Sequence, residues 1–116
     1  MLVYKTATQV RELRPDFARL REVDTFGIIV TAPGDDCDFV SRFFAPRKGV
    51  DEDPVTGSSH CTLVPYWSAR LGKSELHARQ VSARGGELRC RAAGPRVFIS
   101  GQVAWYLEGQ IEIPDA

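Results

Sequence analysis

One stretch of this sequence, residues 51–71 (DEDPVTGSSHCTLVPYWSARL), constrains the fold more than any other. Three acidic residues lead into Pro54, which fixes one backbone φ angle and removes a hydrogen-bond donor. The apolar run that follows predicts a helix over Gly57–Leu71, stopped by Gly72, because glycine accepts the left-handed conformation that ends many helices. The rest of the chain therefore has to pack around this helix.

The predicted helix is apolar on nearly every side, which is typical of a buried helix. Its apolar residues are Cys61, Leu63, Val64, Tyr66, Trp67, Ala69 and Leu71. Thr56 and Ser58 are both candidates to cap its first turn. A buried helix start directs unpaired N–H groups and positive partial charge at one point, which suits a carboxylate or a phosphate. We therefore expect the N–H groups of Gly57, Ser58 and Ser59 to bind an anionic substrate group.

Composition excludes several classes of protein. The chain has 116 residues, enough for one domain with a real core, and its 15 Lys and Arg balance its 15 Asp and Glu. This balance argues against binding to nucleic acid or to a membrane surface. No apolar stretch is long enough to cross a membrane, and the N-terminus lacks a signal-peptide pattern. Three widely spaced cysteines favour reduced thiols, so we expect a cytoplasmic protein without a metal centre.

The other segments predict mainly strands. We expect strands over residues 1–6, 26–32, 37–46, 75–83, 87–92, 96–100 and 101–107. Gly85 and Gly86 indicate a two-residue hairpin, and Gly94–Pro95 indicates a turn. Residues 11–23 carry a one-sided apolar pattern that predicts a flanking helix, with Pro15 in its first turn. The predicted fold class is α+β: a curved antiparallel β-sheet or barrel rolled around one central helix, plus a flanking helix.

The block EDPVTGS at residues 52–58, preceded by RFFAP and followed by QVSARGGEL and RVFISG, closely resembles the C-terminal half of the PhzF-like, phenazine-biosynthesis-type isomerases. The resemblance runs over essentially the whole chain. It implies one half of a diaminopimelate-epimerase-like fold, in which two similar domains each roll a sheet around a central helix. The active site of that family lies between the domains, at the facing helix starts. The resemblance thus implies a single domain, residues 1–116, with the N-terminal half absent.

The resemblance also implies a chemistry, a proton shift without a cofactor on a small cyclic or amino acid substrate. Asp53 and Ser58 match the family residues that help to hold the substrate and the protons in play. The glutamate general base and a partner histidine of the family lie in the N-terminal domain, which this chain does not contain. Thr56 stands where related racemases have a cysteine, so we do not expect racemisation by two thiols.

Each candidate residue has a structural alternative. Asp53 can be a turn residue before proline, and Ser58 can be a helix cap, a ligand contact or both. Asp51 and Glu52 are expected to fix the loop or to face solvent. His60 is expected to be a hydrogen-bonded structural residue. Cys61 is not expected to act as a nucleophile with His60, because adjacent helix positions do not face each other and buried cysteines are usually inert.

Three functions remain open from the sequence. The first is one component of a PhzF-like isomerase, whose missing half is either a separate N-terminal-half chain or a part of the same protein that lies outside this sequence. The second is a non-catalytic module that binds small acids, and the third is an interaction remnant. A homodimer is also expected, because Pro54, Val55, Phe43 and Phe44 are predicted to form an open apolar patch that a second copy would cover.

Overall fold

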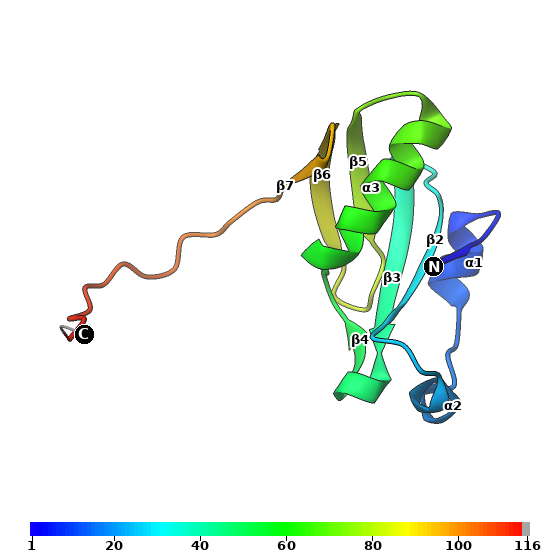
Figure 1. Cartoon of the computed structure of the whole chain (residues 1–116), viewed down its shortest axis with the longest axis horizontal. Helices are drawn as coiled ribbons and strands as arrows, with labels where there is room; N and C mark the ends of the chain where they lie inside the picture. Colours follow the sequence, from blue (N-terminus) through cyan, green and yellow to red (C-terminus); the bar gives the residue numbers. More distant parts are fainter. Residues whose placement is uncertain (115–116) are drawn as a thin grey trace.

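The computed structural model describes residues 1–114, which form one mixed β-sheet with helices on both faces (Figure 1). The strand order is β1-β2-β3-β5-β6-β7, and β4 pairs with β3. The strands are β1 (Leu2–Val3), β2 (Ile28–Pro33), β3 (Phe39–Ala45), β4 (Val50–Asp53), β5 (Glu75–Gln80), β6 (Gly86–Ala93) and β7 (Arg96–Ser100). The helices are α1 (Ala7–Glu12), α2 (Phe17–Glu22) and α3 (Gly57–Leu71), with a single 3₁₀ turn at Pro46–Lys48. Within the described residues, no helix has the length and apolar character needed to span a membrane.

The sheet is mixed, so the prediction of an antiparallel sheet is wrong for two of its strand pairs. Strands β1 and β2 run parallel, and so do β3 and β5. The second pair is parallel because α3 carries the chain back across the sheet between them, as a helical crossover does. In residues 1–114 the sheet stays open, with β1 and β7 at its edges, so α3 covers one face and is not enclosed by a barrel.

Successive side chains of β3 point to opposite faces of the sheet, so they contribute to two separate clusters of core residues. Phe39 points toward α3, where it stacks on Trp67 with ring centres 5.7 Å apart. Val40 and Phe44 point to the other face, where they pack with Val10 of α1. Both clusters are closed to solvent, so the sheet and helix α3 form a rigid support for the residues at the helix start.

Helix α3 has the predicted bounds, and Gly72 ends it with a φ of 68°. The prediction that it is buried on nearly every side is wrong for this chain. Residues Ser59, His60, Leu63, Val64 and Trp67 form its buried face. Cys61 and Leu71 are exposed on the opposite face, because the open sheet contacts only one side of the helix.

Residues 11–23, predicted as one helix, contain only the end of α1 and the whole of α2. Thr6 and Gln9 form a capping box at the start of α1, and the Asp16 carboxylate accepts the Arg19 N–H at 3.1 Å at the start of α2. Pro15 lies in the link between them and not in a first helical turn. The prediction of one continuous helix is therefore wrong, because Pro15 followed by the capping Asp16 begins a new helix.

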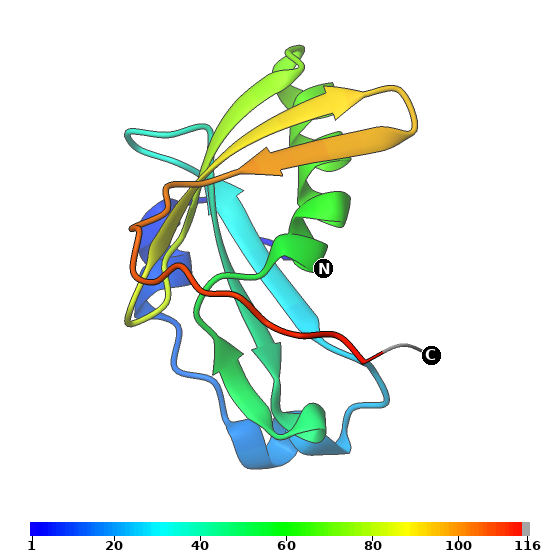
Figure 2. The same cartoon turned by 90° about the vertical axis from the view of Figure 1, so that its left-hand side faces the viewer.

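Three further predictions differ from the structure. Residues 81–85 join β5 to β6 through a five-residue loop, because Gln80 pairs with Gly86, so the two-residue hairpin is wrong. Residues 101–107 form no strand and run away from the body of the protein (Figure 1), and they pass in front of the strands in Figure 2, which is viewed from the side toward which they extend. Phe43 and Phe44 are buried, so the apolar patch expected from them is absent. The turn at residues 94–95 between β6 and β7 is confirmed.

A buried arginine connects three elements near the end of β4. The Arg42 guanidinium donates to both carboxylate oxygens of Glu52, at 2.7 and 2.9 Å. Its remaining nitrogen donates to the carbonyl oxygens of Val10, Arg11 and Leu13 at the end of α1. A cation at a helix C-terminus is favourable because of the helix dipole, and here it also fixes β4 beside β3.

We expect the variant Glu52→Gln to lower the free energy of unfolding by about 3 kcal/mol, because it leaves the buried Arg42 charge without its partner. Urea titration of both proteins measures this change. The matched control is Asp51→Asn, which breaks the exposed Arg21–Asp51 pair and should cost less than about 1 kcal/mol. Equal losses in the two variants would contradict a structural role for the buried pair.

Candidate functional site

The candidate site is the turn from the end of β4 into the start of α3. Asp53 is the last residue of β4 and pairs with Phe43 of the neighbouring strand. Pro54 and Val55 then turn the chain, and Thr56 is the residue before the first helical turn. The sheet on one side and the packed helix on the other fix the ends of this short turn, which holds the Asp53 side chain beside the helix start.

The Asp53 carboxylate is oriented by a network of neutral side chains. The Thr56 hydroxyl donates to Asp53 Oδ2, and it accepts a hydrogen bond from Gln80 Nε2 at 3.0 Å. Gln80 Nε2 also donates to the Asp53 carbonyl oxygen at 2.7 Å, while Gln80 Oε1 accepts the Thr56 backbone N–H at 2.8 Å. Because the amide of Gln80 supplies a donor to the Thr56 hydroxyl, the one hydroxyl proton of Thr56 is directed at the carboxylate.

The loop between β5 and β6 supports the same turn. The Ser82 hydroxyl donates to the Pro54 carbonyl oxygen at 2.8 Å and accepts the Gly85 N–H at 3.0 Å. Val55 lies directly against Gly86, where an added Cβ atom would come within 2.2 Å of the valine side chain. Only glycine therefore fits at Gly86 without moving the turn. The QVSARGG segment thus holds the DPVT segment by both hydrogen bonds and packing.

The start of α3 has no side-chain cap, so neither candidate cap is confirmed. Thr56 occupies the capping position, but its hydroxyl is bonded to Asp53. Gly57 and Ser58 are exposed, whereas Ser59 is buried and its hydroxyl donates to the Thr56 carbonyl oxygen at 2.8 Å. The structure therefore bonds Asp53 to Thr56, the residue directly before the exposed Gly57 and Ser58, and it turns the side chain of Ser59 inward.

The three acids that precede the helix have different surroundings. Asp51 pairs with Arg21, and Glu52 pairs with Arg42, in agreement with the expected loop-fixing roles. Among the described residues Asp53 has no cationic partner, and its Oδ1 atom makes no protein hydrogen bond. Of the three, only Asp53 presents a negative oxygen that is free to meet a ligand at the helix start.

His60 is a structural residue in the core. Its side chain is fully buried, and Nδ1 lies 2.7 Å from the Thr56 carbonyl oxygen. Burial lowers the pKa of His60, which favours the neutral ring, and the Nδ1–H then donates to that carbonyl.

Cys61 lies on the exposed face of α3, contrary to the expected burial. Burial raises the pKa of the Cys90 thiol to about 11, so this cysteine stays protonated.

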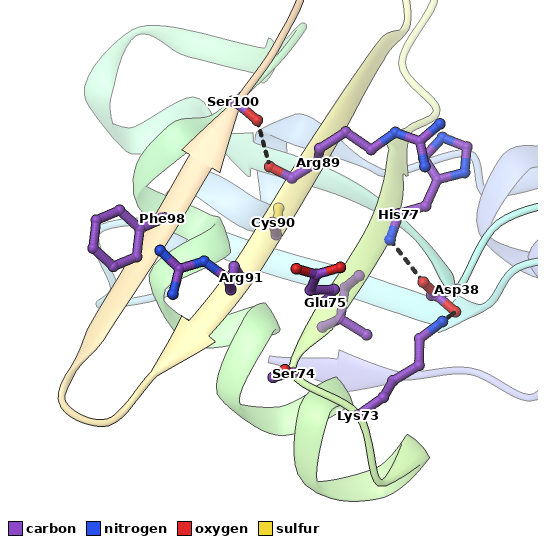
Figure 3. Close-up of a pocket in the computed structure, with 11 residues that line it drawn as sticks. Asp38, Lys73, Ser74, Glu75, His77, Arg89, Cys90, Arg91, Phe98 and Ser100 are labelled. Carbon is purple, nitrogen blue, oxygen red and sulfur yellow. Dashed lines mark hydrogen bonds and ion pairs between the residues drawn. The ribbon is translucent and has the colours of Figure 1, made fainter.

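An open pocket of about 780 Å³ lies on the face of β5 to β7 opposite α3 (Figure 3), and its lining includes Cys90 but neither Asp53 nor the residues that orient it. Arg89 and Arg91 point apart from β6, with Glu75 between them. The Arg91 guanidinium lies over the Phe98 ring, 4.4 Å from its centre, and Lys73 pairs with Asp38. The polar side chains that line this pocket do not converge on one point, so the pocket is not the candidate site. Residues 1–114 contain no group of three or more His, Cys, Asp and Glu arranged to hold a metal ion.

The sequence analysis missed the supporting residues Gln80 and Ser82. A signal for Gln80 was present, because alternation along β5 places it on the same face as the buried residues Leu76 and Ala78. A glutamine at an inward position of a strand needs partners, since an unpaired buried amide is costly. The partners themselves depend on the pairing of β3 with β5, which the predicted antiparallel sheet did not contain.

We expect the variant Gln80→Ala to lower the free energy of unfolding by about 1–3 kcal/mol, because the Thr56 N–H and the Asp53 carbonyl lose buried partners. Chemical denaturation measures the loss, and NMR should show changed amide signals at residues 53–56. Gln110→Ala, at an exposed position, is the control and should change neither quantity. Unchanged signals at residues 53–56 in the Gln80 variant would contradict the role of this network.

Comparison with known proteins places the chain among longer relatives. Residues 1–109 match the family described as phenazine biosynthesis-like protein, PhzC-PhzF. An uncharacterized isomerase of Pseudomonas aeruginosa is 54% identical over 113 residues, which cover 97% of this chain and 43% of the relative. A phenazine biosynthesis-like domain-containing protein of Bos taurus is 52% identical over 93 residues, which cover 73% of this chain and 32% of that protein.

Two solved structures have the same fold. The crystal structure of a PhzF family protein from Enterococcus faecalis has a TM-score of 0.84 and 49% identity, over 85% of this chain and 38% of that one. A putative PhzC/PhzF protein from Clostridium difficile has a TM-score of 0.86 and 46% identity, over 97% of this chain and 44% of that one. The chain thus spans less than half the length of these proteins, and by its sequence and its fold it belongs to the phenazine biosynthesis-like (PhzC-PhzF) family.

Proposed function

We propose that this chain forms one half of the substrate site of an isomerase that moves a proton within a small cyclic or amino acid without a cofactor. The observation that carries the proposal is the Asp53 carboxylate, which a buried network orients beside an uncapped helix start. Membership in a family that includes proteins named as isomerases supports the reaction class. In this proposal the chain corresponds to the C-terminal half of the family's longer members.

The helix start would bind the carboxylate of the substrate. The first N–H groups of a helix lack intrahelical partners, and here no side chain replaces them. A substrate carboxylate that accepts from Gly57, Ser58 and Ser59 would satisfy these donors and meet the positive end of the helix dipole. This contact would fix the substrate with its reacting carbon atoms next to Asp53.

Asp53 would take part in the transfer of the proton. Its Oδ2 accepts from Thr56, so the free Oδ1 is the atom that can accept a proton from the substrate or hydrogen-bond to it. A complete proton shift needs a group that removes the proton from one carbon and a group that delivers it to another. We propose that the second group lies on the part of the longer relatives that this chain does not match.

Binding of a small acid tests the first half of the proposal. Titration with a small carboxylate such as benzoate, followed by amide NMR, should shift the signals of Gly57, Ser58 and Ser59 first. Inorganic phosphate should act in the same way, because the donors recognise negative oxygens of either kind. An uncharged control such as benzamide should give smaller shifts. Shifts elsewhere with no response at residues 57–59 would rule out this binding site.

Reconstitution tests the second half. We expect little turnover from the 116-residue chain alone and measurable proton exchange once the unmatched part of a relative is joined to it. In the joined protein, Asp53→Asn should lower the rate by about 10²–10⁴-fold, as for other acid–base groups. Asp51→Asn changes a nearby acid in the same way and should leave the rate nearly unchanged. Robust turnover by the isolated chain, or full activity of the Asp53 variant, would overturn the assigned roles.

A further inference from the structure

Two buried side-chain atoms of the core have no hydrogen-bond partner within residues 1–114, Ser41 Oγ on β3 and His60 Nε2 on α3. Ser41 is 1% exposed and His60 is 0% exposed, so bulk solvent does not reach either group. A third such atom, His77 Nε2, is accounted for because it lies in an ion pair with Glu87. An unpaired polar group in a protein interior is costly, so the first two atoms call for a partner.

The two unpaired atoms have complementary hydrogen-bonding roles. The Thr56 carbonyl oxygen lies 2.7 Å from His60 Nδ1, and a carbonyl oxygen can only accept, so Nδ1 carries the hydrogen of the neutral ring. His60 Nε2 is then an acceptor that lacks a donor. The Ser41 hydroxyl has one proton to donate, so each group can supply what the other requires.

The register of the sheet places Ser41 beneath the first half of α3. Ser41 lies between Thr31 of β2 and Gln80 of β5, its partners on the two neighbouring strands. Gln80 hydrogen-bonds to the residue before the first turn of α3, and Trp67 of α3 donates to Thr31. The helix crosses the sheet between these two points (Figure 1), and its buried face carries His60 there. Ser41 therefore lies under the part of the helix that includes His60.

An aromatic contact supports this placement. The His60 ring lies against Phe39, with ring centres 5.9 Å apart. Phe39 and Ser41 are two positions apart on β3, so both side chains point to the face of the sheet that carries α3. The His60 ring and the Ser41 hydroxyl thus face the same part of the interface, although no direct hydrogen bond joins them.

We propose that Ser41 and His60 hold one buried water molecule between β3 and the first turns of α3. The water accepts the Ser41 proton and donates to His60 Nε2, and two bonds of about 2.8 Å span a gap of roughly 5 Å that one direct bond cannot. Its second proton has an acceptor on either side, because Thr31 Oγ1 and Gln80 Oε1 each accept one hydrogen bond and keep a lone pair. The water thereby makes about three hydrogen bonds, the number typical of buried water.

The water site connects the sheet to the turn before α3. His60 Nδ1 holds the Thr56 carbonyl oxygen, and the Thr56 hydroxyl holds Asp53. By fixing the His60 ring from its other side, the water supports the same turn from within the core. The site is independent of the proposed function, because it concerns only the packing of α3 on the sheet.

A high-resolution crystal structure of the 116-residue chain tests the site directly. We expect an ordered water within about 3 Å of both Ser41 Oγ and His60 Nε2. In crystals of the variant Ser41→Ala this water should be lost or displaced. The matched control is Ser68→Ala, which removes a hydroxyl group near the other end of α3 and should leave the water in place. A direct hydrogen bond between Ser41 and His60, a dry site between them, or an undisturbed water in Ser41→Ala would overturn the proposal.

A double-mutant cycle tests the bridge in solution. His60→Asn keeps an amide near the position of Nδ1 and removes Nε2, so it breaks the bridge. Ser41→Ala and His60→Asn should each raise the unfolding equilibrium constant in urea, and the double variant should raise it by about 3-fold or more less than the product of the single effects. Ser68 lies roughly 12 Å along the helix from His60, at about 1.5 Å per residue, so Ser68→Ala and His60→Asn should act independently. Independent effects of Ser41→Ala and His60→Asn would reject the bridge.

Discussion

The packing of helix α3 on one face of the sheet is the contact on which the other features of this protein depend. Phe39 and Trp67 stack across the interface, and the Trp67 indole N–H donates to Thr31 Oγ1 at 3.0 Å. To reach this position, the chain has to cross from β3 and β4 to β5 through the helix. The crossover makes β3 and β5 parallel, and this arrangement brings Gln80, at the end of β5, to the turn before α3.

Charge around the site is distributed so that one carboxylate stays free. Arg42 forms an ion pair with Glu52 and also donates to carbonyl oxygens at the end of α1, and Arg21 forms an ion pair with Asp51. The groups that orient Asp53 are all neutral, so they fix its direction without cancelling its charge. In the function proposed above, the free oxygen of Asp53 would serve as the proton acceptor and the uncapped helix N–H groups as the anion receptor. The proposed substrate, a small acid with an exchangeable C–H bond beside its carboxylate, follows from these two roles.

Local patterns predicted the elements that depend on few distant contacts. The bounds of α3 followed from the apolar run between Thr56 and Gly72, because helix periodicity and a glycine stop act within the segment. The flanking helix was wrong because Pro15 and Asp16 begin a second helix, which a single apolar stripe does not reveal. The strand over residues 101–107 was wrong for this chain because a strand needs a partner, and residues 1–114 provide none for it.

The sequence by itself determined the central helix, the family resemblance and the candidate residues Asp53, Gly57, Ser58 and Ser59. These follow from residue types at fixed local spacing. Tertiary structure alone decided that Gln80 orients the turn, that Ser59 and His60 face the core, and that one side of α3 stays open. The physical reason is that hydrogen-bond partners and burial depend on which strands become neighbours, and the pairing of β3 with β5 joins residues that are far apart in the sequence.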